Sequence, residues 1–563
     1  MEGFYDFRRI ALGALISIVS VSLWAIEPPS NMEELKALEA QANAGNAEAQ
    51  DILGDVYLQG ELMPQDYAKA LEWYRKSAQQ GWAGGQFSVG FMYSNGFGVK
   101  EDECEAMKWY TKSAQQNHPR AQFNLAIIYD LGECGKEDNA KAAEWYQRAA
   151  DNGESMAQSN LGAMYYQGDE IPRDMEKAIP LLTSAANLGV PQAQSMLAEI
   201  YYKGVEVAVD YNLAYKWASI AASQGNSAAQ YYLGLMYLEG DGVALNLAKA
   251  FELLTQSAEQ GDAEALFVLG TMYLRGHGTE ANLDTAKELF QKAMDNGQMY
   301  GAYALALTYF KSDYGQQDYA KALQYFTKAS EGGVQEAKYF IAKMYLDGLG
   351  VTQDEAKAVA LYQELAQSGD ADAMYELGEI DFNAKRYDKA LDWYRQGARG
   401  GNVDAQYSIG WMYFTGTGVG QNYTEAYNWL VIAANADSAL AQYYLGRMYY
   451  EGLGIKQSYA DALIWFTKSA NLGDADAQMI LGNMYYQGEG VMSDATKAFT
   501  WIEKSALNGQ SYAQFLLGTL YQEGEGVEKD EKKAIEWYTK SAAQGEEEAK
   551  KALEALRSTS TGD

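Results

Sequence analysis

Small and hydrophobic residues return along this chain at a nearly constant interval of 36 residues. An alanine, or a glycine in its place, opens each copy, and the one exceptional step is the 32 residues from Ala373 to Ala405. The fourteen opening residues are Ala49, Gly85, Ala121, Ala157, Ala193, Ala229, Ala265, Gly301, Ala337, Ala373, Ala405, Ala441, Ala477 and Ala513. Self-similarity at this interval is typical of a solenoid, in which each repeat contacts its neighbours.

Each copy predicts two amphipathic helices, which we call helix A and helix B. The helix A residues that share one face in the first copy are Ala49, Leu53, Val56 and Tyr57. The matching helix B residues are Ala70, Trp73, Tyr74 and Ala78. Gly60 lies where helix A must end, Asp66 precedes helix B and Gly81 follows it.

One such helix pair would leave its apolar face in water, so the pairs must stack. We expect an all-α array of fourteen repeats over residues 45–545, of which the tenth is short. Residues 27–44, with Met32, Leu35 and Leu38, predict an N-terminal capping helix. Residues 546–563 predict a polar C-terminal capping helix and tail.

The repeated columns between Ala49 and Gly545 resemble the SEL-one-like repeat family, a branch of the tetratricopeptide superfamily. The resemblance implies a right-handed α-solenoid of about fourteen stacked antiparallel helix pairs. It also implies that helix A lines the concave side and helix B the convex side. Members of the family mostly act as adaptors that hold proteins or peptides, often in exported or membrane-associated complexes.

Two repeats depart from the pattern. The tenth lacks the Gly-x-Gly-Val loop, because only residues 382–389 separate Asp381 from Ala390, and this spacing predicts a local change in curvature. The eighth has Ser312 where most other repeats have the glycine that ends helix A.

Aromatic residues recur on helix A where a solvated residue is expected. The position two after the opening alanine points about 150° away from the core stripe, yet it is aromatic in ten of the fourteen repeats. With side chains on the same face, the densest run is a candidate partner-binding groove, which we call the ladder. The ladder residues are Tyr303, Phe310, Tyr339, Tyr375, Tyr407, Trp411, Phe414, Tyr443, Arg447 and Tyr450.

Two interpretations of the ladder are open at this point. Its rings either pack between repeats as part of the repeat consensus, or they anchor a protein or peptide client. Acids beside the ladder favour a basic client in the second case. These acids are Glu264, Glu336, Asp372, Asp404 and Asp476.

The chain is strongly acidic, with 44 Lys and Arg against 76 Asp and Glu and a net charge of −32. Nucleic acid is therefore excluded as a partner, because its binding requires cations that replace counterions. The acidity either keeps a long array soluble or selects basic and neutral clients.

The N-terminus resembles a secretory signal. Arg8 and Arg9 precede an uncharged run over residues 10–26, with candidate cleavage after Ser22 or Ala25. Residues 1–25 therefore predict a signal peptide and a periplasmic or secreted protein, with no integral membrane segment after cleavage. An uncleaved N-terminal anchor and a cytoplasmic chain are the alternatives.

Candidate chemistry is sparse. Cys104 and Cys134 lie on the same predicted edge of the stack, so they form either a disulfide or two free thiols, and two cysteines make no zinc site. The only histidines, His118 and His277, are expected to be exposed loop residues.

No phosphate loop, zinc motif or dinucleotide fingerprint occurs, so we expect no catalytic residues, metal or cofactor. The sequence therefore predicts a non-catalytic exported scaffold that binds a protein or peptide in its concave groove. A cell-wall glycan-binding module and an accessory subunit of an envelope enzyme complex are the alternatives.

Overall fold

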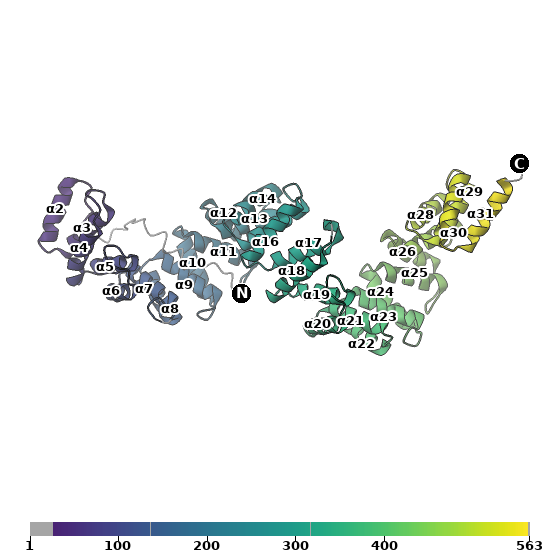
Figure 1. The fold of residues 1–563 in the computed structure, drawn as a ribbon, viewed down its shortest axis with the longest axis horizontal. Helices are drawn as coiled ribbons and strands as arrows, with labels where there is room; N and C mark the ends of the chain where they lie inside the picture. Colours follow the sequence, from purple (N-terminus) through teal and green to yellow (C-terminus); the bar gives the residue numbers. More distant parts are fainter. Residues whose placement is uncertain (1–25, 136, 316, 561–563) are drawn as a thin grey trace. The chain divides into compact units, whose positions relative to one another are not determined.

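The computed structural model describes residues 26–135, 137–315 and 317–560, with side chains to residue 556. In this part of the chain the structure is entirely helical, with helices α2 to α31, one 3-10 turn and no strand. A and B helices alternate along the sequence (Figure 1). The prediction of an all-α solenoid is therefore confirmed, whereas the proposed signal peptide over residues 1–25 lies outside the described residues.

The helices fall into two compact units, Met1–Gln317 and Asp318–Asp563, and within each unit every helix packs against the next. The boundary lies inside the eighth repeat. There Lys311 follows α17 (Tyr300–Phe310) with extended backbone, and a 3-10 turn, η1 (Ser312–Tyr314), takes the place of a left-handed glycine. The boundary thus coincides with the missing cap glycine of the eighth repeat rather than with the short tenth repeat.

The first unit begins with the capping helix α2 (Met32–Asn43), which buries Leu35 and Leu38 against the first repeat and leaves Met32 exposed. Its A helices are α3 (Ala47–Gln59), α5 (Ala83–Asn95), α7 (Pro119–Leu131), α9 (Ser155–Gln167), α11 (Pro191–Lys203), α13 (Ser227–Glu239), α15 (Ala263–Arg275) and α17. Its B helices are α4 (Tyr67–Gln79), α6 (Glu103–Ala114), α8 (Asn139–Asp151), α10 (Met175–Asn187), α12 (Tyr211–Ser223), α14 (Leu247–Glu259) and α16 (Leu283–Asp295).

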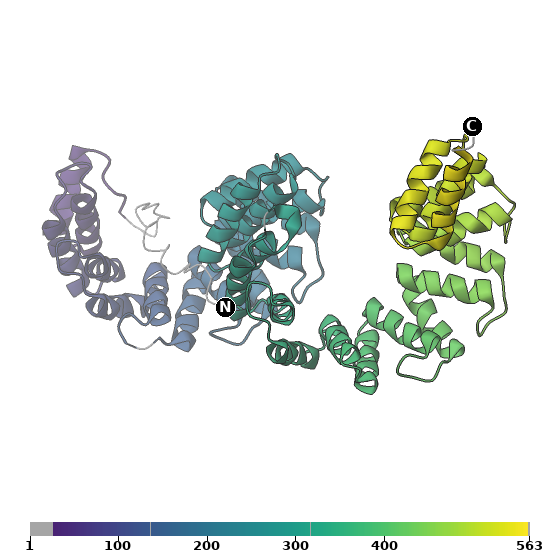
Figure 2. The same ribbon diagram turned by 45° about the vertical axis from the view of Figure 1, so that its right-hand side comes forward.

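The second unit begins with a B helix and ends with the capping helix α31 (Glu547–Ser560). Its A helices are α19 (Glu336–Asp347), α21 (Ala371–Asn383), α23 (Val403–Thr415), α25 (Ala439–Glu451), α27 (Ala475–Gln487) and α29 (Ser511–Glu523). Its B helices are α18 (Tyr319–Glu331), α20 (Glu355–Gln367), α22 (Tyr387–Arg399), α24 (Tyr423–Asn435), α26 (Tyr459–Asn471), α28 (Ala495–Leu507) and α30 (Glu531–Ala543). The later pairs of this unit lie in successive layers, green to yellow in Figure 2.

Within most repeats, a glycine in helix A lets a large residue of helix B come close. A Cβ on Gly446 would lie 2.8 Å from the ring of Phe466, and a Cβ on Gly378 would lie 2.5 Å from the ring of Tyr394. Both separations are shorter than a carbon–carbon contact allows. In these repeats the absent side chain lets the helix B ring lie directly against helix A. Alanine takes the place of the glycine at Ala126, Ala306 and Ala342, and the facing rings of Tyr146, Phe326 and Tyr362 are buried there as well.

The helix ends follow the sequence prediction. Gly60 ends α3 with a left-handed φ of 74°, and its N–H donates to the carbonyl oxygen of Val56. The Asp66 carboxylate caps α4 by accepting from the backbone N–H of Lys69 at 3.0 Å. These groups satisfy backbone atoms that a helix leaves unpaired at its ends.

Helix A lies on the inner side of each unit. Beyond neighbours in sequence, the more extensive helix–helix contacts join A helices of consecutive repeats. These pairs are α3 with α5, α9 with α11, α11 with α13, α21 with α23 and α23 with α25. In a curved stack the elements on the inner side come closest together, so the A helices line the inner face, as the family resemblance implies.

A buried glutamine joins three helices at several repeat junctions. In α27, the Gln478 side chain donates to the carbonyl oxygen of Ala470 in α26 at 3.0 Å and accepts from the Asn508 side chain after α28 at 3.0 Å. We call this column the glutamine clamp. Its members are Gln50, Gln86, Gln122, Gln158, Gln194, Gln230, Gln406, Gln442, Gln478 and Gln514.

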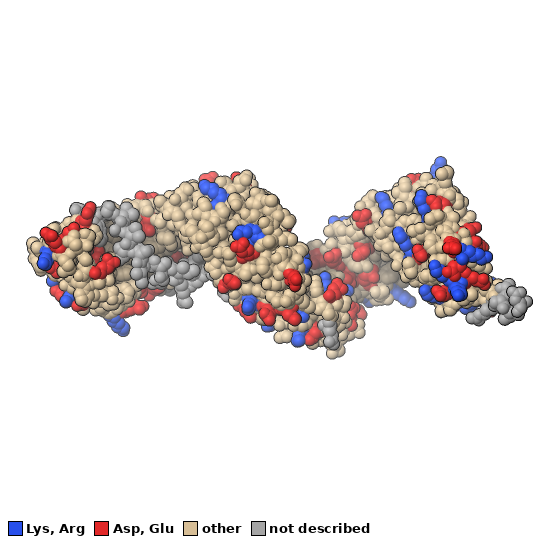
Figure 3. Space-filling model, turned by 90° about the horizontal axis from the view of Figure 1, so that it is seen from above, with Lys and Arg blue, Asp and Glu red and all other residues tan. Residues whose placement is uncertain are grey.

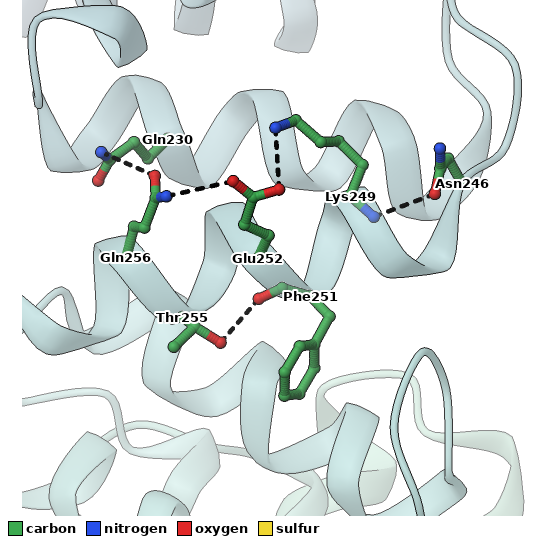
Figure 4. A network of polar contacts seen from close by, with 7 residues as sticks. All are labelled: Gln230, Asn246, Lys249, Phe251, Glu252, Thr255 and Gln256. Carbon is green, nitrogen blue, oxygen red and sulfur yellow. Dashed lines mark hydrogen bonds and ion pairs between the residues drawn. The ribbon is translucent and has the colours of Figure 1, made fainter.

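The clamp has local variants. Figure 4 shows the side chain of Gln230 in α13 donating to the side chain of Gln256 in α14. Gln256 in turn donates to the carboxylate of Glu252, which also accepts from Lys249. Repeats seven to ten lack the glutamine altogether. Their residues at this position are Leu266, Ala302, Lys338 and Met374.

A buried polar cluster occupies the A helices of the first repeats. Asp51 accepts from the hydroxyl of Ser88 at 2.9 Å, and Asp55 accepts from the hydroxyl of Tyr74 at 2.6 Å. Burial raises the pKa of Asp55 to about 6, opposed by the hydrogen bond from Tyr74 and by the charge of Arg120. Burial and the neighbouring Asp55 raise the pKa of Asp51 as well.

His118 is a half-buried helix cap, so the expectation of an exposed loop residue is wrong. Its Nδ1 accepts from the backbone N–H of Ala121 at 3.2 Å, and its ring stacks on Phe87 with centroids 4.8 Å apart. Burial, with the charge of Arg120, lowers the pKa of His118 to about 4. The neutral ring therefore accepts a hydrogen bond from the first turn of α7 and caps the N-terminus of this helix.

We expect Gln478→Leu to lower the free energy of unfolding by about 1–3 kcal/mol, because it removes one hydrogen bond from the buried Ala470 carbonyl and one from the Asn508 amide. Urea denaturation followed by circular dichroism measures the loss. Gln487→Leu makes the same chemical change at an exposed position of α27 and should cost much less. Equal effects of the two substitutions would contradict a role for the clamp.

We expect Asp55→Asn to flatten the pH dependence of stability. The folded pKa of about 6 lies above the ordinary 3.8, so the folded state binds this proton more tightly, and wild-type stability falls as the pH rises from about 4 through 6. The amide still accepts from Tyr74 but has no proton to lose. Urea denaturation should show that, between pH 4 and pH 7, the free energy of unfolding of the variant rises relative to that of wild type by on the order of 2 kcal/mol. A constant difference between the two proteins would contradict this.

Candidate client-binding face

The ladder residues lie on A helices of both units. Tyr303 and Phe310 belong to α17 in the first unit, and the other eight belong to α19, α21, α23 and α25 in the second. All ten are at least half-buried. The eight residues of the second unit are therefore described together, and Tyr303 and Phe310 by themselves.

Rings of the second-unit ladder rest on the helix B aromatics of their own repeats. Tyr375 packs on Tyr394 with ring centroids 5.9 Å apart, and Tyr443 packs on Phe466 at 6.1 Å. Tyr339 contacts Tyr362 in the same way at 5.6 Å. The expectation that this helix position is solvated is therefore wrong, because the close approach of helix B brings a ring beneath it.

In the first unit, Tyr303 contacts the ring of Tyr300 one turn earlier on α17, with centroids 6.4 Å apart. Phe310 is the last residue of the same helix, and its carbonyl oxygen accepts from the Gln317 side chain at 2.8 Å.

Tyr444 connects the ladder residues of two successive repeats. The indole N–H of Trp411 donates to its hydroxyl at 3.2 Å, and its ring lies 5.0 Å from Phe414 and 6.0 Å from Tyr407. Our sequence analysis missed this residue. It occupies the position next to the aromatic column, and a tyrosine there was the signal that could have identified it.

Arg447 is the one cation of the ladder. Its guanidinium lies 5.3 Å from the centroid of the Phe414 ring, and its Nε donates to the carboxylate of Glu451 at 2.9 Å. Its charge is thus matched within its own helix.

Carboxylates accept from tyrosine hydroxyls on this face. Tyr339 donates to Glu376 at 2.6 Å, from one repeat to the next, and Tyr450 donates to Glu489 at 2.6 Å. Tyr394 donates to Glu379 at 2.5 Å. Burial and the bond to Glu376 raise the pKa of Tyr339, so its proton remains in place.

Negative charge on this face is largely uncompensated. In the described part of the chain, Asp372, Glu376, Glu379 and Asp404 form no ion pair with Lys or Arg. At the repeat positions that these four acids occupy, the A helices of the second unit carry two cations, Lys343 and Arg447. Arg447 pairs with Glu451. Red acidic side chains gather over the first repeats of the second unit in Figure 3. A cationic group would therefore meet carboxylates and ring faces together.

The structure joins Cys104 to Cys134 in a disulfide, with Cα atoms 5.1 Å apart. The bond ties the start of α6 to the loop after α7. Among the described residues, no three His, Cys, Asp or Glu side chains gather in a metal-binding arrangement. In that same part of the chain, no helix combines the length and apolarity needed to cross a membrane.

Solved structures with the same fold include c5321, a protective antigen present in uropathogenic Escherichia coli strains that displays an SLR fold. It is 28% identical, covers 85% of this chain and 97% of its own, and has a TM-score of 0.54. A Sel1 repeat protein from Oxalobacter formigenes is 30% identical over 40% of this chain and 94% of its own, with a TM-score of 0.38. No match is found among curated proteins.

The family model for the Sel1 repeat matches fourteen consecutive segments. They are residues 47–82, 83–118, 119–154, 155–190, 191–226, 227–262, 263–298, 300–334, 335–370, 371–402, 403–438, 439–474, 475–510 and 511–546. With matches along almost its whole length, the chain belongs to the Sel1 repeat family.

Proposed function

We propose that this protein is a non-catalytic, exported scaffold that binds a basic protein or peptide on the A helices of its second unit. Sel1 repeat proteins are generally protein-interaction scaffolds and typically non-catalytic. The proposal adds a location, a face and a class of client to this general role.

The observation that carries the proposal is the pairing of fixed rings with unpaired carboxylates. Glu376 and Glu379 accept from tyrosine hydroxyls and form no ion pair within the described part of the chain, and Asp372 and Asp404 are exposed beside them. Rings that are packed from below lose little freedom when a client binds, so they suit the role of anchors. A chain of net charge −32 also attracts a cationic client over a longer range.

Export is supported by the sequence and by a relative. The apolar run over residues 10–26 lies largely outside the described residues and remains a signal-peptide hypothesis. The Cys104–Cys134 disulfide suits an oxidising compartment. The E. coli relative c5321 is described as a protective antigen, which fits a protein that antibodies can reach.

The client class can be tested with a fluorescein-labelled peptide of alternating Arg and Leu, and an Arg-to-Glu version of it. We expect only the basic peptide to bind by fluorescence polarisation. The combined substitutions Glu376→Gln, Glu379→Gln and Asp404→Asn should weaken its binding about tenfold, since three partly exposed charge contacts are lost.

The matched control neutralises three acids on B helices of the same unit, with Asp461→Asn, Glu531→Gln and Glu536→Gln. It changes the net charge equally but should reduce affinity less than twofold. An equal loss in both variants would mean that only net charge matters, and this would overturn the proposed face.

Export can be tested by N-terminal sequencing of the protein from its native host. We expect the mature chain to begin after Ser22 or Ala25, since signal peptidase cuts after small residues. A chain that begins at Met1 and fractionates with cytosolic markers would contradict export.

A further inference from the structure

A cavity of about 560 Å³ opens beside the short tenth repeat of the second unit. Its lining residues are Val359, Gln363, Leu377, Ile380, Asp381, Arg386, Lys389 and Trp393. None of them belongs to the ladder. We propose that this cavity binds a carboxylate carried on an apolar body, such as a small aromatic acid or a peptide end.

The cavity lies where a loop of the repeat is missing. In the ninth repeat, the loop places Gly350 against the backbone of Tyr319 at the start of the preceding B helix. In the eleventh repeat, Gly418 lies against the side chain of Tyr387, again at the start of the preceding B helix. In the tenth repeat only residues 384–386 join α21 to α22, so no such loop reaches the start of α20. Val359 on the next turn of α20 consequently faces the cavity.

The floor of the cavity is apolar and includes an aromatic ring. Leu377 and Ile380 are buried, and Val359 and Trp393 are half-buried. In six other repeats a cation three residues after the matching tryptophan lies over its ring, at 3.8 to 4.5 Å from the centroid. Gln396 takes that place after Trp393, so no cation covers this ring from its own helix. The ring is thus available as a platform for an apolar group.

The rim carries more positive than negative charge. Arg386 donates through Nε to the carboxylate of Asp381 at 2.5 Å, which satisfies Asp381. Within the described residues Lys389 forms no ion pair, and the Gln363 amide is exposed nearby. Among those residues Lys389 is therefore a cation without an acidic partner at the rim, and it favours an anion.

These features together define the ligand. The volume is in the range of small-molecule sites, which are commonly apolar with a few polar groups. An apolar body would lie on Trp393 and Val359, and its carboxylate would reach Lys389 at the rim. The cations at this rim contrast with the unpaired acids of the proposed client-binding face, and the proposal does not depend on the proposed client.

The test is calorimetry on the full-length protein with N-acetyl-leucyl-phenylalanine as the free acid and as the amide. We expect the acid to bind about fivefold more tightly, since the amide cannot pair with Lys389. Lys389→Ala should remove this preference. Trp393→Leu should weaken both probes about fivefold, and leucine occupies the matching position of other repeats, as at Leu361, so this variant should fold.

The matched controls are Lys497→Ala and Trp465→Leu, at the equivalent positions of repeats with a complete loop. They should leave binding of both probes unchanged. A second design replaces residues 384–386 with residues 348–354, the loop of the ninth repeat, and should abolish binding while helicity is retained.

Several results would overturn the proposal: no heat at millimolar probe, equal affinity for acid and amide, or equal effects of the control and cavity variants. A parallel titration with 3-phenylpropionate identifies the source of the carboxylate. Affinity equal to that of the dipeptide would assign the cavity to free small acids, and a preference for the dipeptide would assign it to peptide ends. Both of these results support the site.

Discussion

The close approach of helix A to helix B, allowed by a glycine, is the constraint on which the rest of each repeat depends. A side chain at Gly446 or Gly378 would overlap the ring of Phe466 or Tyr394. Close packing on all sides holds the ring in one position beneath helix A. Most repeats are thus units of two helices packed around one large helix B residue, and at several junctions the glutamine clamp joins such units through hydrogen bonds.

The same constraint explains why packing and binding are compatible roles for the ladder. Tyr375 and Tyr443 rest on rings that are themselves fixed, so their free edges have a defined position on the inner face. One side of each ring packs on helix B, and the opposite side would contact the proposed client. In the proposed complex, the carboxylates of Glu376 and Glu379 would favour a basic client over a neutral one.

Much of the fold could be predicted because it depends on local rules. The 36-residue interval, the helix faces, the Gly60 cap and the Asp66 cap all follow from spacing and backbone preference. Contacts between repeats were harder to predict. By its position alone, Gln478 would be a solvated residue near the start of a helix, and only the stacked neighbours show that its buried amide bonds to Ala470 and Asn508 on the adjoining helices. His118 was misjudged for the same reason, since Phe87 of the preceding repeat covers its ring.

The candidate site shows a similar division. The aromatic column was visible in the sequence, and packing between repeats was one of its two open interpretations. The helix B ring beneath each position could not be predicted, because helix periodicity describes one helix and not its neighbour. Tyr444 and the acceptors Glu376 and Glu379 emerged only from contacts between helices. The short tenth repeat was visible as a missing loop, whereas the cavity that this loss opens required the neighbouring repeats to be in place.

The central claim is that the inner face of the second unit holds the client. Site-specific photocrosslinking in the native host tests it most directly, with benzoylphenylalanine introduced in place of Asp372 or Asp404 on A helices, or of Asp461 or Glu536 on B helices. We expect both A-helix positions to crosslink the same basic protein, as identified by mass spectrometry, and the B-helix positions to give no such product. Crosslinks to that protein from the B-helix positions alone, or equally from all four, would contradict the account.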